Sequence, residues 1–291
     1  MAIDPRAQPR ELELPVGETT LAARAWGRTD EPPVLALHGW LDNAASFDPL
    51  APLLTGTHLV ALDLAGHGRS PHRRNGPWYH LVDYIVDAMA VADALGWQRF
   101  TVLGHSLGGA IATLMAGAQP ERIDALYLIE ALGPFSEPAD AAPRRLGRAL
   151  ERAQRSPTRT PPTYPDLEAA TEARRAVGGL SADAARRLVE RATVASDGGL
   201  RWRSDRRLRW PSPAYFTEEQ VRAFLAAIAA PTTVVRADGG LMPPADPAVE
   251  ARLAALGHPR VIEVAGNHHV HLEDPALVAR ALGWPPIATA R

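Results

Sequence analysis

A serine between two glycines is the residue of this sequence whose surroundings best suit catalysis. Ser106 lies in Gly-His-Ser-Leu-Gly, between an apolar, β-branched stretch at 101–103 and a run of helix formers at 110–118. A tight turn between a strand and a helix holds a serine hydroxyl clear of the sheet, and such a strained turn needs small neighbours such as Gly104 and Gly108. This context favours Ser106 as a nucleophile over a serine in an ordinary turn.

A histidine-rich loop near the C-terminal end of the sequence offers a partner for this serine. His268, His269 and His271 follow the last predicted strand, 260–264. A histidine can take the proton of a serine hydroxyl and later pass it to the leaving group. The three histidines cannot all face one ion from a loop without further ligands, so we expect no metal site here.

Two acids at the ends of predicted strands are candidates to orient that histidine. Glu130 ends the apolar stretch 123–129, and Asp238 follows the apolar stretch 232–237. A carboxylate at a strand end can hold the Nδ1–H group of a histidine in a neighbouring loop. From the residues alone, either acid fits this role.

Short apolar strands alternating with amphipathic helices are expected to position these residues. This alternation predicts a mostly parallel sheet covered by helices on both faces. The predicted strands are two short strands within 11–26, then 33–37, 59–64, the stretch before Gly104, 123–129, 232–237 and 260–264. The predicted helices are 44–54, 80–95, 110–118, 247–256 and a last helix that ends at Leu282.

A segment rich in proline and arginine interrupts this alternation between 134 and 216. It carries helical patterns at 144–154, 167–176 and 182–193, and predicts a helical cap inserted before the penultimate strand. The core domain would then be 1–133 together with 217–291. Between 144 and 209 there are 16 arginines and 8 acids. These arginines indicate either solvated helix faces or attraction of anionic substrates.

The composition excludes several classes of chemistry. The 291 residues include no cysteine, which excludes disulfides, thiolate metal sites and cysteine nucleophiles. They also include no lysine, which excludes Schiff-base chemistry and a P-loop. The sequence has no signal-peptide pattern, no membrane-length apolar run and no nucleic-acid recognition motif. We therefore expect a cytoplasmic protein, a monomer or homodimer, with no cofactor and no membrane or nucleic-acid partner. The composition, rich in alanine, arginine and proline and free of lysine, favours a bacterial source.

Several motifs resemble those of the α/β-hydrolase fold superfamily, and the resemblance covers nearly the whole chain. The serine follows a central strand, the acids follow later strands, and the histidine comes after the final strand, which is the order typical of that fold. The motifs are His38-Gly39-Trp40, the loop 66–70, the serine motif 104–109 and Gly266-Asn-His268. Within the superfamily, the stretches 129–134 and 197–205 are similar to the serine-hydrolase-like branch.

The resemblance implies a choice among the histidines and the acids. His268 matches the Gly-x-His pattern of the family and would be the general base. In most of the superfamily the acid would fall at Gly240, which has no side chain, and Asp238 comes two residues too early. A haloalkane-dehalogenase-like subset carries a glutamate where Glu130 stands. We therefore favour Glu130 as the acid, with Asp238 as the alternative.

The oxyanion hole and the substrate pocket follow from the same resemblance. The backbone N–H groups of Trp40 and Leu107 would stabilise the negative charge that develops on the substrate oxygen. The substrate pocket would be lined by four residues in particular, with Phe47 and Trp202 as further aromatic candidates. The four residues are Trp40, His105, Phe135 and Trp210.

The expected function is hydrolysis of a carboxylic ester or lactone through an acyl-enzyme on Ser106. A serine nucleophile excludes dehalogenase and epoxide-hydrolase chemistry, which require a carboxylate at that position. A C–C bond hydrolase or a cofactor-free perhydrolase would use the same residues. A non-catalytic ligand-binding protein of this fold is the alternative from a different class.

Overall fold

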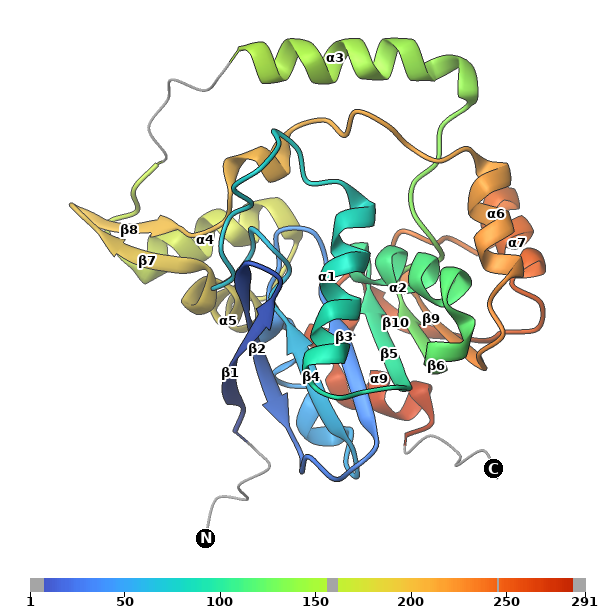
Figure 1. Cartoon of the computed structure of the whole chain (residues 1–291). Helices are drawn as coiled ribbons and strands as arrows, with labels where there is room; N and C mark the ends of the chain where they lie inside the picture. Colours follow the sequence, from blue (N-terminus) through green and yellow to red (C-terminus); the bar gives the residue numbers. More distant parts are fainter. Residues whose placement is uncertain (1–7, 156–161, 245, 285–291) are drawn as a thin grey trace, which may run out of the picture.

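An eight-stranded sheet forms the centre of the computed structural model, which describes residues 8–155, 162–244 and 246–284 (Figure 1). The strand order is β1-β2-β4-β3-β5-β6-β9-β10. β1 pairs antiparallel with β2, and β2 with β4, whereas all the remaining neighbours are parallel. The strands are β1 Arg10–Val16, β2 Thr19–Trp26, β3 Pro33–Leu37, β4 His58–Leu62, β5 Phe100–His105, β6 Ile123–Ile129, β9 Thr232–Gly239 and β10 Arg260–Asn267. This arrangement confirms the predicted fold.

Helices cover both faces of this sheet. Their bounds are α1 Leu81–Ala94, α2 Leu107–Ala118, α6 Glu218–Ala226, α7 Pro247–Ala255, α8 Val270–Glu273 and α9 Pro275–Leu282. The predicted helix 44–54 is wrong, because this stretch forms two short 3₁₀ turns, Ala44–Phe47 and Ala51–Leu53. Pro49 and Pro52 explain the difference, since neither has the backbone N–H that a continuous α-helix requires.

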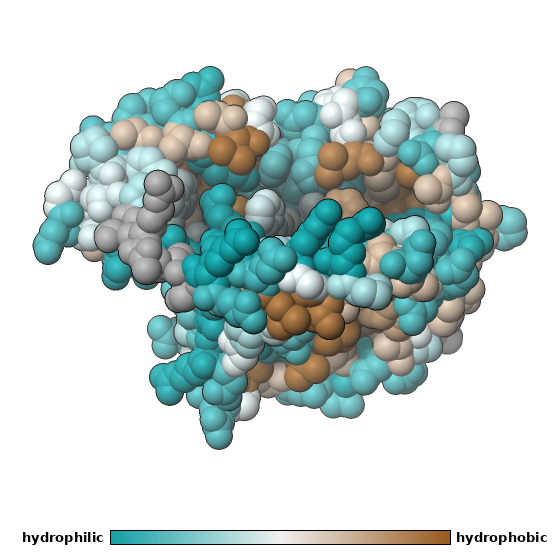
Figure 2. All heavy atoms as spheres, turned by 90° about the horizontal axis from the view of Figure 1, so that it is seen from above, coloured by the Kyte–Doolittle hydropathy of each residue, from teal (hydrophilic) through white to brown (hydrophobic). Residues whose placement is uncertain are grey.

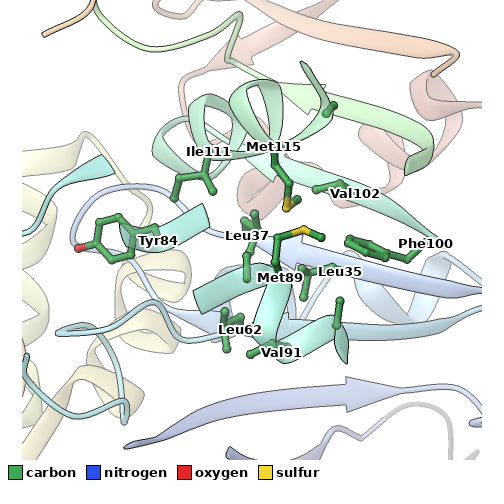
Figure 3. Close-up of a cluster of buried hydrophobic side chains, with 14 of the residues drawn as sticks. Leu35, Leu37, Leu62, Tyr84, Met89, Val91, Phe100, Val102, Ile111 and Met115 are labelled. Atoms are coloured by element: carbon green, nitrogen blue, oxygen red, sulfur yellow. The ribbon is translucent and has the colours of Figure 1, made fainter. Parts of the chain in front are cut away.

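The core has two layers because alternate residues of each central strand point to opposite faces of the sheet. Leu35 and Leu37 of β3 belong to one buried cluster, and Val34 and Ala36 belong to the other. Figure 3 shows the first cluster, where Leu35, Leu37 and Val102 of the sheet lie between side chains of α1 and α2. Burial on both faces accounts for the continuous apolar stretches in the sequence.

The described parts of the insertion, 134–155 and 162–216, contain three α-helices and a hairpin. The helices are α3 Ala142–Gln154, α4 Leu167–Gly178 and α5 Ala182–Ala192, close to the predicted ranges. The antiparallel hairpin of β7 Thr193–Ser196 and β8 Gly199–Trp202 was not predicted, although Asp197-Gly198 between the strands is a strong turn signal. In Figure 1, α3 runs across the top of the molecule, away from the sheet. No described helix is both long and apolar enough to span a bilayer.

A buried arginine attaches α5 to the sheet. Arg191 is 1% exposed, and its Nε donates to both carboxylate oxygens of Asp63, at 3.0 and 2.9 Å. Its Nη1 donates to the Glu11 carboxylate of β1, at 2.8 and 2.9 Å. Asp63 also accepts backbone N–H bonds from Ala44 and Arg69. One carboxylate after β4 therefore fixes α5 and two loops.

Replacing Arg191 with methionine should lower the free energy of unfolding by about 3 kcal/mol, because the buried Asp63 carboxylate loses its cation. Chemical denaturation would measure this loss. Arg186→Met is the matched control, since Arg186 lies on the same helix in an exposed pair with Glu190 and should contribute less than about 1 kcal/mol. Equal losses in the two variants would show that Arg191 does not anchor the insertion.

Candidate active site

Ser106 occupies a strained turn between β5 and α2. Its backbone has φ 51° and ψ −114°, a conformation that non-glycine residues rarely adopt. Its N–H donates to the carbonyl of Ile129, 3.1 Å away. A β-carbon at Gly104 would overlap the backbone of 108–109, and one at Gly108 would overlap the carbonyl of Leu37. The glycines are thus required by close packing of α2 against the strands.

Glu130 lies at the end of β6, next to β5, and its carboxylate is buried and held by backbone donors. The residue is 3% exposed. Oε1 accepts a hydrogen bond from the N–H of Ala237, and Oε2 accepts one from the N–H of Leu241, both at 2.6 Å. Nδ1 of His268 lies 3.2 Å from Oε2. The structure therefore brings Glu130 and His268 together.

Gly240 explains why a carboxylate from the neighbouring strand fits at this place. A β-carbon at residue 240 would overlap the carboxylate group of Glu130. The missing side chain leaves the space that the Glu130 carboxylate fills, and the flanking N–H groups of the 237–241 turn stabilise its charge. An acid after β9 and an acid after β6 would compete for the same volume.

Asp238 has a different environment. It is exposed, and its Oδ1 accepts a hydrogen bond from the N–H of Gly266, 2.9 Å away. Within residues 8–155, 162–244 and 246–284, the structure contains no hydrogen bond between Asp238 and His268. Asp238 therefore joins β9 to β10 in this structure.

Polar side chains support the loop that carries His268. His105 is fully buried, and its Nε2 lies 2.8 Å from the carbonyl oxygen of His268. Burial and the neighbouring histidines lower the pKa of His105 well below its usual value. A neutral His105 can donate from Nε2 to that carbonyl, which positions the loop behind the His268 imidazole.

Asp42 connects this loop to the inserted segment. Its Oδ1 lies 2.7 Å from Nη2 of Arg174 on α4, and its Oδ2 lies 3.3 Å from Nε2 of His269. Burial alone would raise the pKa of Asp42, but His269, Arg174 and His105 together hold it well below its usual value. A charged Asp42 therefore joins the loop after β3, the histidine loop and α4.

A large cavity opens beside Ser106 and His268. Its volume is about 1120 Å³, and Trp40, His105, Phe135, Trp202 and Trp210 are among its lining residues. Phe47 lies outside the cavity lining and is completely buried in the core, so the expectation for this residue is wrong. Several large apolar side chains at the cavity are strongly exposed, a feature typical of binding surfaces. They are Trp40, Val82, Phe135, Val177, Tyr215 and Leu241.

The two proposed backbone donors lie at the same end of the sheet. Leu107 is the first residue of α2, so its N–H has no acceptor within that helix. Trp40 follows β3, and its indole N–H donates to the carbonyl of Leu208 in the insertion, 3.0 Å away. The Trp40 side chain therefore forms part of the cavity wall. Across the described ranges, no group of three or more histidine or acidic residues could hold a metal ion.

Gly240→Ala should displace the Glu130 carboxylate and lower the rate of the expected hydrolysis at Ser106 by roughly a hundredfold, the scale expected for a misplaced catalytic group. Steady-state kinetics would measure the rate. Gly147→Ala is the control, because a β-carbon at Gly147 on α3 meets no atom within 4 Å. Full activity of Gly240→Ala would contradict the proposed requirement for this space.

His271 should make stability depend on pH. Burial lowers its pKa from 6.5 to about 3. Between these values the unfolded chain binds a proton at His271 that the folded chain does not, so stability falls as the pH falls. His271→Leu should reduce the slope of unfolding free energy against pH by about 1.4 kcal/mol per pH unit between pH 4 and 6. An unchanged slope in acid titrations would contradict a buried, neutral His271.

Comparison with known proteins places this architecture in a family. A family model described as alpha/beta hydrolase fold matches residues 32–275. The serine hydrolase-like protein of Mus musculus is 31% identical over 94% of this chain and 94% of its own length. The serine hydrolase-like protein of Danio rerio is 30% identical over 94% of this chain and 86% of its length.

Solved structures agree with this assignment. A hypothetical protein of Pseudomonas aeruginosa is 43% identical, with a TM-score of 0.89 over 94% of this chain and 97% of that structure. A thioesterase domain from the curacin biosynthetic pathway is 27% identical, with a TM-score of 0.84 over 94% of this chain and 99% of that structure. The sequence match, the sheet order and the strand-to-helix turn at Ser106 agree, and the chain belongs to the α/β-hydrolase fold family.

Proposed function

We propose that this protein is a serine hydrolase that cleaves a carboxylic ester or lactone through an acyl-enzyme on Ser106. The observation that carries the proposal is the contact between His268 Nδ1 and the Glu130 carboxylate, at 3.2 Å, beside the cavity that Ser106 lines. The serine hydrolase-like relatives support a hydrolytic role. Lipase LipV of Mycobacterium tuberculosis, 31% identical over 75% of this chain, supports an ester bond as the target.

In this mechanism, Glu130 determines which ring nitrogen of His268 carries the hydrogen. The carboxylate accepts a hydrogen bond from Nδ1–H, which leaves Nε2 free to take the Ser106 proton. Ser106 Oγ attacks the carbonyl carbon, and the N–H groups of Leu107 and Trp40 stabilise the oxyanion. The imidazolium then protonates the departing alcohol, and the acyl group stays on Ser106.

The second half of the reaction releases the acid. His268 removes a proton from a water molecule, and the resulting hydroxide attacks the acyl carbon. The tetrahedral intermediate collapses, the proton passes from His268 to Ser106 Oγ, and the carboxylic acid leaves. We further propose that residues 134–216 act as a cap, because Trp40, Trp202 and Trp210 bring the insertion and the core together around the cavity.

Ser106→Ala should abolish the burst of p-nitrophenol from a short-chain p-nitrophenyl ester, because no acyl-enzyme can form. Glu130→Gln should lower the rate roughly a thousandfold to ten-thousandfold, the loss expected when the histidine loses its orienting carboxylate. Stopped-flow absorbance would measure both the burst and the steady state.

Asp238→Asn is the matched control, since it removes the other candidate acid and should leave the rate within about threefold of the wild type. A large loss in Asp238→Asn with full activity in Glu130→Gln would reverse the assignment of the acid. A folded wild-type protein that turns over neither short nor long esters would favour the ligand-binding alternative.

A further inference from the structure

A second, smaller recess lies between the start of α3 and the segment 210–215. Its volume is about 90 Å³, and most of its lining is charged. The lining residues are Glu137, Ala141, Arg144, Arg145, Arg148 and Pro211. Three arginines against one acid give the recess a positive balance.

The three arginines have different partners. Arg145 forms a bidentate ion pair with Glu137, and its guanidinium lies 3.6 Å from the ring centre of Tyr215. Arg144 and Arg148 stand one helical turn apart on α3 and are exposed. Neither forms a hydrogen bond or an ion pair with any residue in the described part of the chain. Two cations of the recess are therefore available to an incoming anion.

Two exposed arginines on α5 have acidic partners. Arg186 and Arg187 on α5 each pair with an acid one turn away, Glu190 and Asp183 respectively. Such pairs are the usual arrangement on a solvated helix face. The acid Glu151 on α3 lies 3.5 Å from Arg155, so it does not neutralise the recess. Arg201 and Arg209 of the insertion are also exposed and form no hydrogen bond or ion pair with a described residue, but neither lines the recess.

The recess and the catalytic cavity lie on either side of the segment 210–215. Pro211 lines both, and Trp210, Ser212 and Tyr215 of the same segment line the cavity. Figure 2, which looks onto α3, shows a hydrophilic band crossing this face, with hydrophobic patches on either side and a hollow beside it. An anion held in the recess would therefore lie close to the cavity in which the acyl group reacts.

We propose that Arg144, Arg145 and Arg148 bind a phosphate group of the substrate while its acyl group occupies the cavity. A guanidinium group binds phosphate oxygens through paired hydrogen bonds, and the recess is of the size of a small anion. The substrate class is an acyl ester or thioester joined to a phosphate by a flexible arm, as in coenzyme A thioesters and phospholipids. This inference rests on the proposed hydrolysis at Ser106.

Binding is measured first, without turnover, by titrating coenzyme A into the Ser106→Ala protein in a calorimeter. The Arg144→Gln/Arg148→Gln pair should weaken binding about tenfold or more, because two charged hydrogen-bonding groups are lost. The pair Arg186→Gln/Arg187→Gln removes the same charge from the same insertion and should leave binding within about twofold. Equal weakening by both pairs would overturn the site, since only net charge would then matter.

Catalysis is measured next with substrates that differ only in the phosphate-bearing part. Octanoyl coenzyme A is compared with the octanoyl thioester of N-acetylcysteamine, and dihexanoyl phosphatidylglycerol is compared with dihexanoylglycerol. The Arg144→Gln/Arg148→Gln pair should lower kcat/KM about tenfold for a phosphate-bearing substrate and change it less than twofold for its neutral partner.

The outcomes separate the two proposals and the two phosphate sources. Arginine dependence with the coenzyme A thioester alone assigns the phosphate to a thioester carrier, and dependence with the phospholipid alone assigns it to a lipid headgroup. Arginine-dependent binding of coenzyme A without hydrolysis of any substrate would support the recess and overturn the proposed hydrolase. Loss of kcat/KM that is equal for charged and neutral substrates, or absent from both, would overturn the recess.

Discussion

A buried carboxylate at the end of β6 is the constraint around which the candidate active site is built. The Glu130 carboxylate is removed from water, so its charge must be compensated by nearby donors. The N–H groups of Ala237 and Leu241 and the imidazole of His268 supply them. These donors lie at the end of β9 and in the loops that follow β9 and β10, because the parallel strands β5, β6, β9 and β10 are neighbours and end at one edge. The strand order thus brings together residues far apart in the sequence.

Buried ion pairs attach α4 and α5 of the insertion to the core, whereas α3 is held by fewer buried contacts. Arg191 and Arg174 place guanidinium groups of α5 and α4 on the buried acids Asp63 and Asp42. Buried ion pairs contribute more to geometry than to net stability, because desolvation offsets most of the Coulombic gain. α3 has no comparable buried pair among the residues that the structure describes, and its one fully buried side chain there is that of Ala149. This difference makes α4 and α5 the fixed part of the cavity wall.

Much of the fold could be predicted from the sequence because its signals are local. Alternating strands and helices, and the glycines around Ser106, follow from periodicity and backbone sterics. Helix α6 is absent from the predicted helices, and two further elements differ from the prediction although their sequences carry local signals. These signals are Pro49 and Pro52 within the predicted helix 44–54, and Asp197-Gly198 between two short strands.

The acid and the arginine recess depend on distances that sequence spacing does not encode. Glu130 and Asp238 both follow strands, and only the three-dimensional arrangement distinguishes the one beside His268 from the one that binds Gly266. The glycine at position 240 is explained only by the structure, in which the Glu130 carboxylate fills the space that a side chain at 240 would need. Similarly, the excess of arginine is visible in the sequence, whereas only the structure shows that Arg144 and Arg148 form no ion pair or hydrogen bond with an acid of the described ranges and interact with Glu137 at longer range.

The most direct test of the account is the rate and site of labelling by a fluorophosphonate, followed by mass spectrometry of the intact and digested protein. This reagent reacts with a serine hydroxyl only when the serine is activated. We expect a single label on Ser106, with a rate that falls sharply in Glu130→Ala and remains near that of the wild type in Asp238→Ala. A label on another residue, or a rate that depends on Asp238 and not on Glu130, would contradict the account.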